Sequence, residues 1–104
     1  MIEKIEGLGT LVNLATLNLS HNRITKLENL ETLVMLKNLD VSHNQIADYH
    51  DLEGALALPE LTSLDVSSNQ IEEHEGFVEF MTQFQQIMCL YFKGNPFMRK
   101  ISKY

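Results

Sequence analysis

The sequence is poor in the residue types that mark several large protein classes. Its 104 residues include no tryptophan, two prolines and one cysteine, Cys89. One cysteine excludes an internal disulfide, and the missing cysteine-rich segments favour a reducing compartment, either the cytosol or the nucleus. No apolar run reaches the roughly 18 residues of a membrane span, and Met1–Lys4 lacks the charged-then-apolar pattern of a secretory signal. We therefore expect a cytoplasmic or nuclear protein with no membrane partner.

Basic residues are scarce over most of the chain. Residues 1–92 carry all 14 acids and four of the eight lysines and arginines, for a net charge of −10, whereas residues 93–104 carry the other four, for +4. The acidic majority excludes nucleic acid as a partner of the main body. We interpret the basic end as a solvated segment, with contact to an acidic surface as the alternative.

A pattern of apolar residues followed by an asparagine occurs four times. Each copy has the form L-x-x-L-x-L-x-x-N-x-I, with other apolar residues at some of the leucine and isoleucine positions. The copies start at Leu14, Leu36, Leu61 and Ile87, so their spacings are 22, 25 and 26 residues. A fixed period of about 20–50 residues is typical of solenoids and other repeat arrays. We predict one domain, composed of a half-repeat 1–13, repeats 14–35, 36–60 and 61–86, and a terminal repeat with the start of a cap at 87–104.

The apolar spacing inside each copy predicts the fold. Alternation such as Leu17-x-Leu19 indicates a short strand with one buried face, and strands this short persist only when stacked on neighbours. We expect an α/β right-handed solenoid with a parallel inner sheet. Return segment 25–35 suits turns or a 3₁₀ helix, whereas 48–59 and 74–86 predict α-helices. Asp48 would cap the first helix, and these residues would face the core: Tyr49, Leu52 and Leu56 in the first, Phe77, Phe80, Met81 and Phe84 in the second.

Each copy contains one asparagine at the point where the chain leaves its strand. A buried turn leaves backbone N–H and C=O groups that water cannot reach, and a carboxamide can donate to and accept from them. We therefore predict a structural ladder formed by Asn22, Asn44, Asn69 and Asn95.

Both ends of the chain resemble the interior of a repeat array. No strand is predicted before Leu17, and no return segment follows the last copy. Uncapped repeats expose core residues and a strand edge. We expect these residues to be a segment of a longer solenoid, truncated at both ends, with self-association through the open ends as the alternative.

The residues between the inward apolar positions fall on the open face of the predicted sheet, which solenoids commonly offer to protein partners. We predict protein-binding residues there: Thr16, Asn18, Asn38, Asp40, Ser63, Asp65, Tyr91 and Lys93. Asp40 and Asp65 would be neighbours about 4.8 Å apart, a like-charge pair that favours a cationic partner group. Tyr91 is the expected anchor, since tyrosine is enriched in interface hot spots. The competing interpretation is a hydrated polar face with no specific ligand.

The sequence gives little support for metal binding, catalysis or phosphate binding. His21 and His43 occupy matching turn positions, but Ser68 and Gly94 follow in that column, so a metal site lacks further ligands and exposed turn histidines are the preferred interpretation. Asp40 and Asp65 would lie on an open sheet with nothing to exclude water, which disfavours a catalytic carboxylate pair. No glycine-rich phosphate loop is present. We predict no enzyme activity, no metal and no cofactor.

The repeat and its 22-residue spacing resemble the short subtype of leucine-rich repeat, typified by the nuclear regulator of protein phosphatase 1. Ser20, Ser42 and Ser67 fit the serine position of that repeat. The stretch Gly94–Tyr104 has the form G-N-P-x-x-R-K-I-x-x-Y, which is similar to the opening of the terminal cap in the leucine-rich-repeat family of dynein axonemal assembly factors. The lengthened later repeats also match that family.

The resemblance implies a scaffold or adaptor, not an enzyme. Members of that family act in the cytoplasmic preassembly of dynein arms for the cilium or flagellum, among dynein chains and chaperones. The resemblance to the same repeat subtype leaves two alternatives: a phosphatase-regulating repeat protein and an axonemal dynein light chain.

Overall fold

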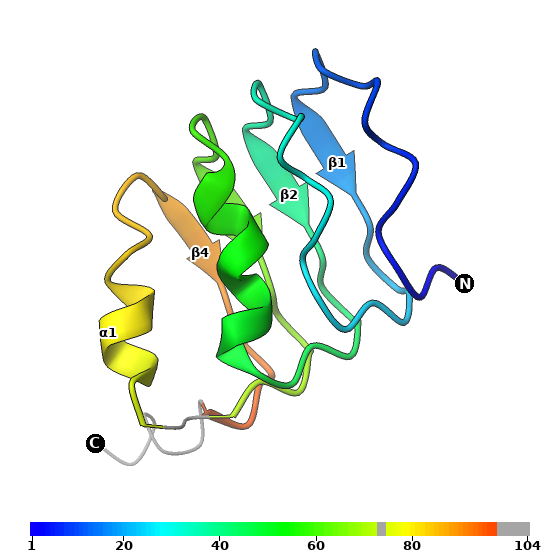
Figure 1. Cartoon of the computed structure of the whole chain (residues 1–104). Coiled ribbons are helices and arrows are strands. Elements are labelled where there is room, and N and C mark those ends of the chain that lie inside the picture. The colour runs from blue at the N-terminus through cyan, green and yellow to red at the C-terminus, as the bar shows by residue number, and fades with distance from the viewer. Residues whose placement is uncertain (73–74, 98–104) are drawn as a thin grey trace.

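A computed structural model describes residues 1–72 and 75–97 of the chain. Four short strands form one parallel sheet: β1 (Thr16–Asn18), β2 (Asn38–Asp40), β3 (Ser63–Asp65) and β4 (Cys89–Tyr91). Their order in the sheet follows their order in the sequence, and matching positions of successive copies pair in register, as Leu17 does with Leu39. Figure 1 shows β1, β2 and β4 running in the same direction, with β3 between β2 and β4 and partly hidden behind a helix. The predicted parallel sheet is confirmed.

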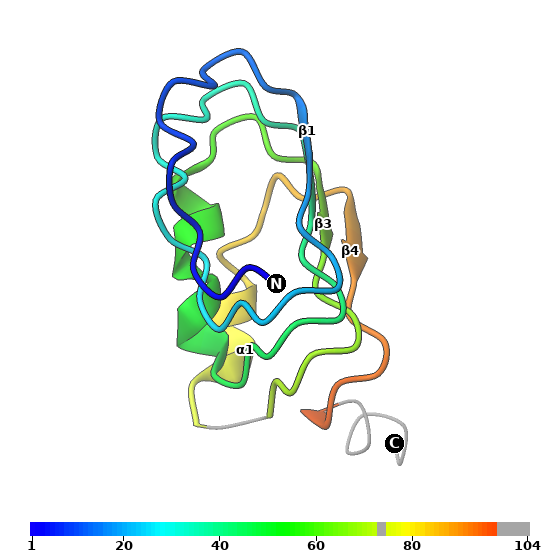
Figure 2. The ribbon, with the colours of Figure 1, turned by 90° about the vertical axis from the view of Figure 1, so that its right-hand side faces the viewer.

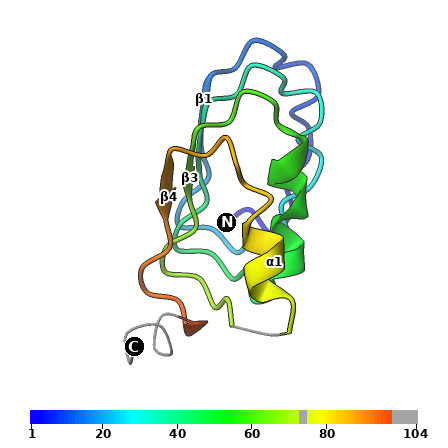
Figure 3. The same cartoon turned by 90° about the vertical axis from the view of Figure 1, so that its left-hand side faces the viewer.

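The structure has two layers, with the sheet on one side and the return segments on the other. The views in Figures 2 and 3 place η1 (Tyr49–Ala57) and α1 (Phe77–Met81) opposite the strands, and the chain closes a loop around the space between them. Apolar side chains fill that space. Residues such as Ile24, Leu36 and Leu61 have no exposed surface. Burying each such side chain contributes about 1.5–3 kcal/mol, which holds together strands too short to be stable alone.

The return after β2 is a 3₁₀ helix, not the α-helix that the spacing suggested. Its buried residues recur every third position, at Tyr49, Leu52, Ala55 and the following Leu58, which matches three residues per turn. Leu56, predicted to face the core, is only half-buried, and Ala55 takes that place. The Asp48 side chain accepts a hydrogen bond from the His50 N–H at 2.9 Å, so the predicted cap is confirmed.

The helix predicted over residues 74–86 is much shorter. In the structure α1 covers only Phe77–Met81, and residues 73–74 lie outside the described residues. Gly76 precedes it with a positive φ of 86°, and Thr82 ends it with its hydroxyl bonded to the Glu79 carbonyl at 2.6 Å. Phe84 is still buried, but it lies in a turn beyond the helix. The apolar spacing identified residues that pack inward, while the local turn chemistry shortened the helix that carries them.

Two side chains in the helical layer, Tyr49 and Asp51, have raised pKa values. Tyr49 is buried among Phe77 and Phe80, and its hydroxyl donates to the Glu75 carbonyl. Burial raises the pKa of Tyr49, and the nearby carboxylates, Asp48 first among them, raise it further. Burial also raises the pKa of Asp51, again reinforced by Asp48. Both groups lie on the return side of the molecule, away from the open face of the sheet.

Candidate functional site

Side chains that point away from the core form two columns across the strands. The first runs from Thr16 through Asn38 and Ser63 to Cys89, and the second from Asn18 through Asp40 and Asp65 to Tyr91. The middle residue of each strand is less exposed than its neighbours, which fixes the two columns on the outer side. We call the surface made by these two columns the open sheet face. Every predicted binding residue within β1 to β4 lies on it.

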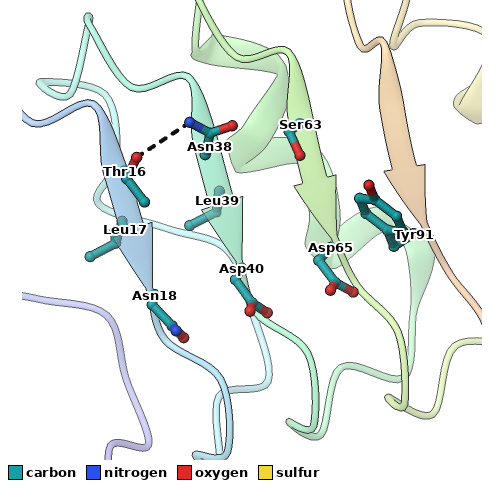
Figure 4. Close-up of a pocket in the computed structure, with 9 residues that line it drawn as sticks. All are labelled: Thr16, Leu17, Asn18, Asn38, Leu39, Asp40, Ser63, Asp65 and Tyr91. Carbon is teal, nitrogen blue, oxygen red and sulfur yellow. Dashed lines mark hydrogen bonds between the residues drawn. The ribbon is translucent and has the colours of Figure 1, made fainter.

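A shallow hollow of about 230 Å³ lies on the open sheet face. Figure 4 shows its lining: side chains of both columns project from β1, β2 and β3, and the Tyr91 ring stands next to Asp65. The only hydrogen bond drawn between these residues joins the Asn38 amide to the Thr16 hydroxyl at a long 3.3 Å. The hollow is open to solvent and has none of the water exclusion that a catalytic pocket needs.

The second column has a structural role that the sequence interpretation missed. In β2 the Asp40 Oδ1 accepts from the Ser42 N–H at 2.9 Å and from the Ser42 hydroxyl at 2.6 Å. Asn18 makes the same pair of bonds with Ser20, and Asp65 makes it with the serine two residues further on, Ser67. Each is an Asx turn that closes the end of its strand. The spacing of an Asn or Asp two residues before a serine was visible in all three copies.

The fourth strand departs from that pattern at both positions. Tyr91 stands where the other strands have Asn or Asp, and Lys93 stands where they have serine. The Tyr91 side chain is 54% exposed, although it is large and mostly apolar. Together with Asp65, Lys93 and neighbouring residues it also lines a second, wider hollow of about 550 Å³. At the end of β4, therefore, an aromatic ring (Tyr91) and an ammonium group (Lys93) occupy the positions that close the turn after each of the other three strands.

The ladder asparagines lie on the core side of the same strand ends. Asn44 is buried and joins two repeats: its Oδ1 accepts from the Ile24 N–H at 2.9 Å, and its Nδ2 donates to the carbonyls of Leu19 and Val41, each at 3.0 Å. Asn69 and Asn95 repeat this arrangement one and two units further along. Asn22, at the first copy, bonds to the Ile2 N–H and only to carbonyls of its own turn. The amides fix the turns and face away from any partner on the open sheet face.

The residue before each ladder asparagine has a positive φ. His21, His43 and Ser68 have φ values of 60°, 55° and 54°, and Gly94 has 84°. The imidazole rings of His21 and His43 stack in parallel, with centroids 4.2 Å apart and planes 9° apart. Parallel stacked rings do not converge on one ion, and the described residues contain no group of three potential metal ligands. These histidines are turn residues, and nothing in their geometry indicates a metal site.

The comparison with known families supports what the geometry indicates. The sequence profile of the leucine-rich repeat matches residues 1–102. The chain belongs to the leucine-rich-repeat family. A comparison of the sequence with curated proteins found no match. Leucine-rich repeats are in general non-enzymatic protein-interaction domains, and this one has the stacked parallel strands that present such an interaction face.

The described part of this leucine-rich-repeat domain contains no helix long and apolar enough to cross a membrane.

Of the predicted binding residues, the structure brings Asn18, Asp40, Asp65 and Tyr91 together in one column. It places Thr16, Asn38 and Ser63 in the other column, and it puts Lys93 beyond the end of β4, beside the wider hollow.

Proposed function

We propose that this leucine-rich-repeat domain is a scaffold or adaptor that docks a protein partner on its open sheet face. The exposed Tyr91 carries the proposal. Its ring lies at the end of a polar column, lines both hollows, and replaces a residue that the other strands use for turn closure. A tyrosine with an exposed apolar ring and a polar tip is a common anchor in protein interfaces.

The more specific role we propose is in the assembly of dynein arms, with dynein chains or their chaperones as partners and the cytoplasm, cilium or flagellum as the location. The resemblance of residues 94–104 to the cap of dynein axonemal assembly factors supports it, together with the lengthened later repeats. Residues 98–104 lie outside the described part of the chain.

We also propose that the solenoid is right-handed, because parallel strand crossovers are right-handed in about 98% of cases.

The test compares two single substitutions that add the same side chain to opposite layers. Ser63→Arg places bulk at the centre of the open sheet face, and Val78→Arg places it on an exposed position of α1. The immobilised chain is expected to retain dynein heavy or intermediate chains, or their chaperones, from a lysate of ciliated cells. Ser63→Arg should abolish this recovery, and Val78→Arg should leave it unchanged, as measured by mass spectrometry.

Two results would contradict the proposal. Equal recovery by the two variants would show that the open sheet face is not the docking surface. Recovery of protein phosphatase 1 alone, without any dynein component, would reject the dynein role in favour of the phosphatase-regulating alternative.

A further inference from the structure

We propose that the partner segment docked on the open sheet face is basic and extended, and that an arginine of that segment binds between Asp40 and Asp65 beside the Tyr91 ring. This inference rests on the proposed function, because it assigns the chemistry of the partner to the face already proposed for docking. It adds which charge the partner carries, which side chain delivers it and which residues receive it.

The first argument is unbalanced charge. Asp40 and Asp65 are direct neighbours in the paired strands β2 and β3, where adjacent strands lie about 4.8 Å apart. Within residues 1–72 and 75–97 neither carboxylate forms an ion pair with a lysine, arginine or histidine. Residues 1–92 as a whole have a net charge of −10. A cationic group on the partner would relieve the repulsion between the two carboxylates and gain from the surrounding acidic field.

The second argument is the orientation of the two carboxylates. Oδ1 of Asp40 is engaged by Ser42, and Oδ1 of Asp65 by Ser67. These bonds fix both side chains and leave Oδ2 of each without a hydrogen-bond donor in the described part of the chain. Figure 4 shows the two carboxyl groups projecting in the same direction from neighbouring strands. The protein has already immobilised the acceptors, so a ligand that bridges them loses less conformational entropy on binding.

The third argument distinguishes arginine from lysine. A guanidinium group is planar and has five N–H donors that fan outward, so one group can bond to an oxygen on each of two strands. It also stacks on aromatic rings, and Tyr91 is paired in register with Asp65 on the next strand. A lysine ammonium is a compact point charge that gains less from either feature. The arrangement of two fixed carboxylates and one exposed ring therefore fits arginine best.

Lys93 limits how far the basic segment extends. It is exposed and lines the wider hollow beyond Tyr91, together with Asp65. A second cation on the partner would be repelled there, so the arginine is expected over β2 and β3, with uncharged residues of the segment passing the end of β4. The face of four short strands covers only about 300 Å², against roughly 800 Å² per partner in a stable complex, so binding by this face alone should be weak.

The chain supplies its own isosteric control for the test. Asn18 makes the same two hydrogen bonds to its serine that the aspartates make, so an amide fully replaces the carboxylate in the turn. Asp40→Asn and Asp65→Asn therefore remove the charge and keep the fold. The matched control is Glu53→Gln with Glu60→Gln, which removes two charges from exposed positions outside the sheet. The probe is a fluorescein-labelled nine-residue peptide of serines with one central arginine, compared with the same peptide carrying neutral citrulline or lysine at that position.

The arginine peptide is expected to bind the unaltered chain more tightly than the lysine peptide, and the citrulline peptide should not bind. The double variant Asp40→Asn/Asp65→Asn should bind about tenfold more weakly, as two exposed ion pairs are lost, while the Glu53/Glu60 control changes little. Lys93→Gln should tighten binding about twofold. Raising the sodium chloride concentration from 50 to 300 mM should weaken it. Fluorescence anisotropy measures peptide binding in each of these comparisons, and circular dichroism checks that each variant is folded.

Several outcomes would overturn the inference. Equal loss of binding in the aspartate and glutamate variants would assign the effect to net charge. Tighter binding after Arg99, Lys100 and Lys103 are changed to glutamine would identify the chain's own basic end as the occupant. If peptide binding is lost only at concentrations where the chain dimerises, the occupant of the open sheet face is a second copy of the chain. If the arginine peptide fails to bind while Ser63→Arg still abolishes recovery of dynein components, the proposed function stands and the arginine chemistry is wrong.

Discussion

Asn44 lies between two neighbouring repeats and satisfies backbone groups of both. Substitution Asn44→Ala would leave the buried Ile24 N–H without its acceptor. It would also remove one of the two side-chain donors to each of the Leu19 and Val41 carbonyls, which keep their bonds to Asn22 and Asn69. We expect the free energy of unfolding to fall by about 2–3 kcal/mol, measured by urea denaturation. Asn22→Ala should cost about 1 kcal/mol or less, since Asn22 is partly exposed, its bond to the Ile2 N–H is open to solvent, and its carbonyl partners lie in its own turn. Equal losses in the two variants would contradict a ladder whose strength comes from joining repeats.

The residue scale also shows how unevenly the sequence predicted the site. The position of Asp40 beside Asp65 follows from the repeat register and was predicted. The Asx turns were not predicted, although the spacing was visible, because a polar residue on an open strand was interpreted only as a binding residue. The stacking of His21 on His43 was not predicted, and neither was the positive φ of both residues, which is uncommon outside glycine.

At the scale of elements, the close approach of η1 to the preceding return segment depends on one glycine. A Cβ atom at Gly54 would overlap the carbonyl oxygen of Leu27, whose own N–H donates to the Asp51 carbonyl at 2.8 Å. Alanine normally stabilises a helix relative to glycine by about 1 kcal/mol. We expect Gly54→Ala to do the reverse and lower the free energy of unfolding by about 2–3 kcal/mol, as in other overpacked sites.

The comparison variant for Gly54→Ala is Glu53→Ala, on an exposed position of the same helix, which should change the midpoint of thermal unfolding little. A Gly54→Ala protein as stable as the unaltered chain would mean that η1 moves away from Leu27 without cost, and that the two returns are not tightly packed.

The return segments were predicted less accurately than the sheet, and the reason is physical. Strand positions follow from a single periodic rule, since each Leu or Val must point into the space shared with the next repeat. The returns have several ways to bury the same residues. Spacing of three at Tyr49, Leu52 and Ala55 leads to a 3₁₀ helix, and a glycine with positive φ followed by Thr82 restricts α1 to five residues. Apolar pattern alone does not decide among these local solutions.

At the scale of the whole molecule, β1 and β4 are the outer strands of the sheet, and each has a neighbour on one side only among the described residues. Edge strands expose backbone N–H and C=O groups that can pair with another chain. Exposed Met88 directly precedes β4 and exposed Tyr91 is its last residue, at 83% and 54% exposure. We propose that these 104 residues in isolation self-associate through this edge as their concentration rises.

Sedimentation velocity over about 5–500 µM should show the weight-average sedimentation coefficient increasing with concentration, and a hydrophobic dye should fluoresce on binding. Met88→Lys places a charge beside the edge and should shift the association to higher concentration, because charged side chains are a common way to block edge pairing. The same change on the far side of the molecule, Val78→Lys in α1, serves as the control and should have no effect. A chain that stays monomeric over the whole range and leaves the dye dark would show that the short β4 edge cannot pair with a second copy, and that association of this fold depends on other surfaces.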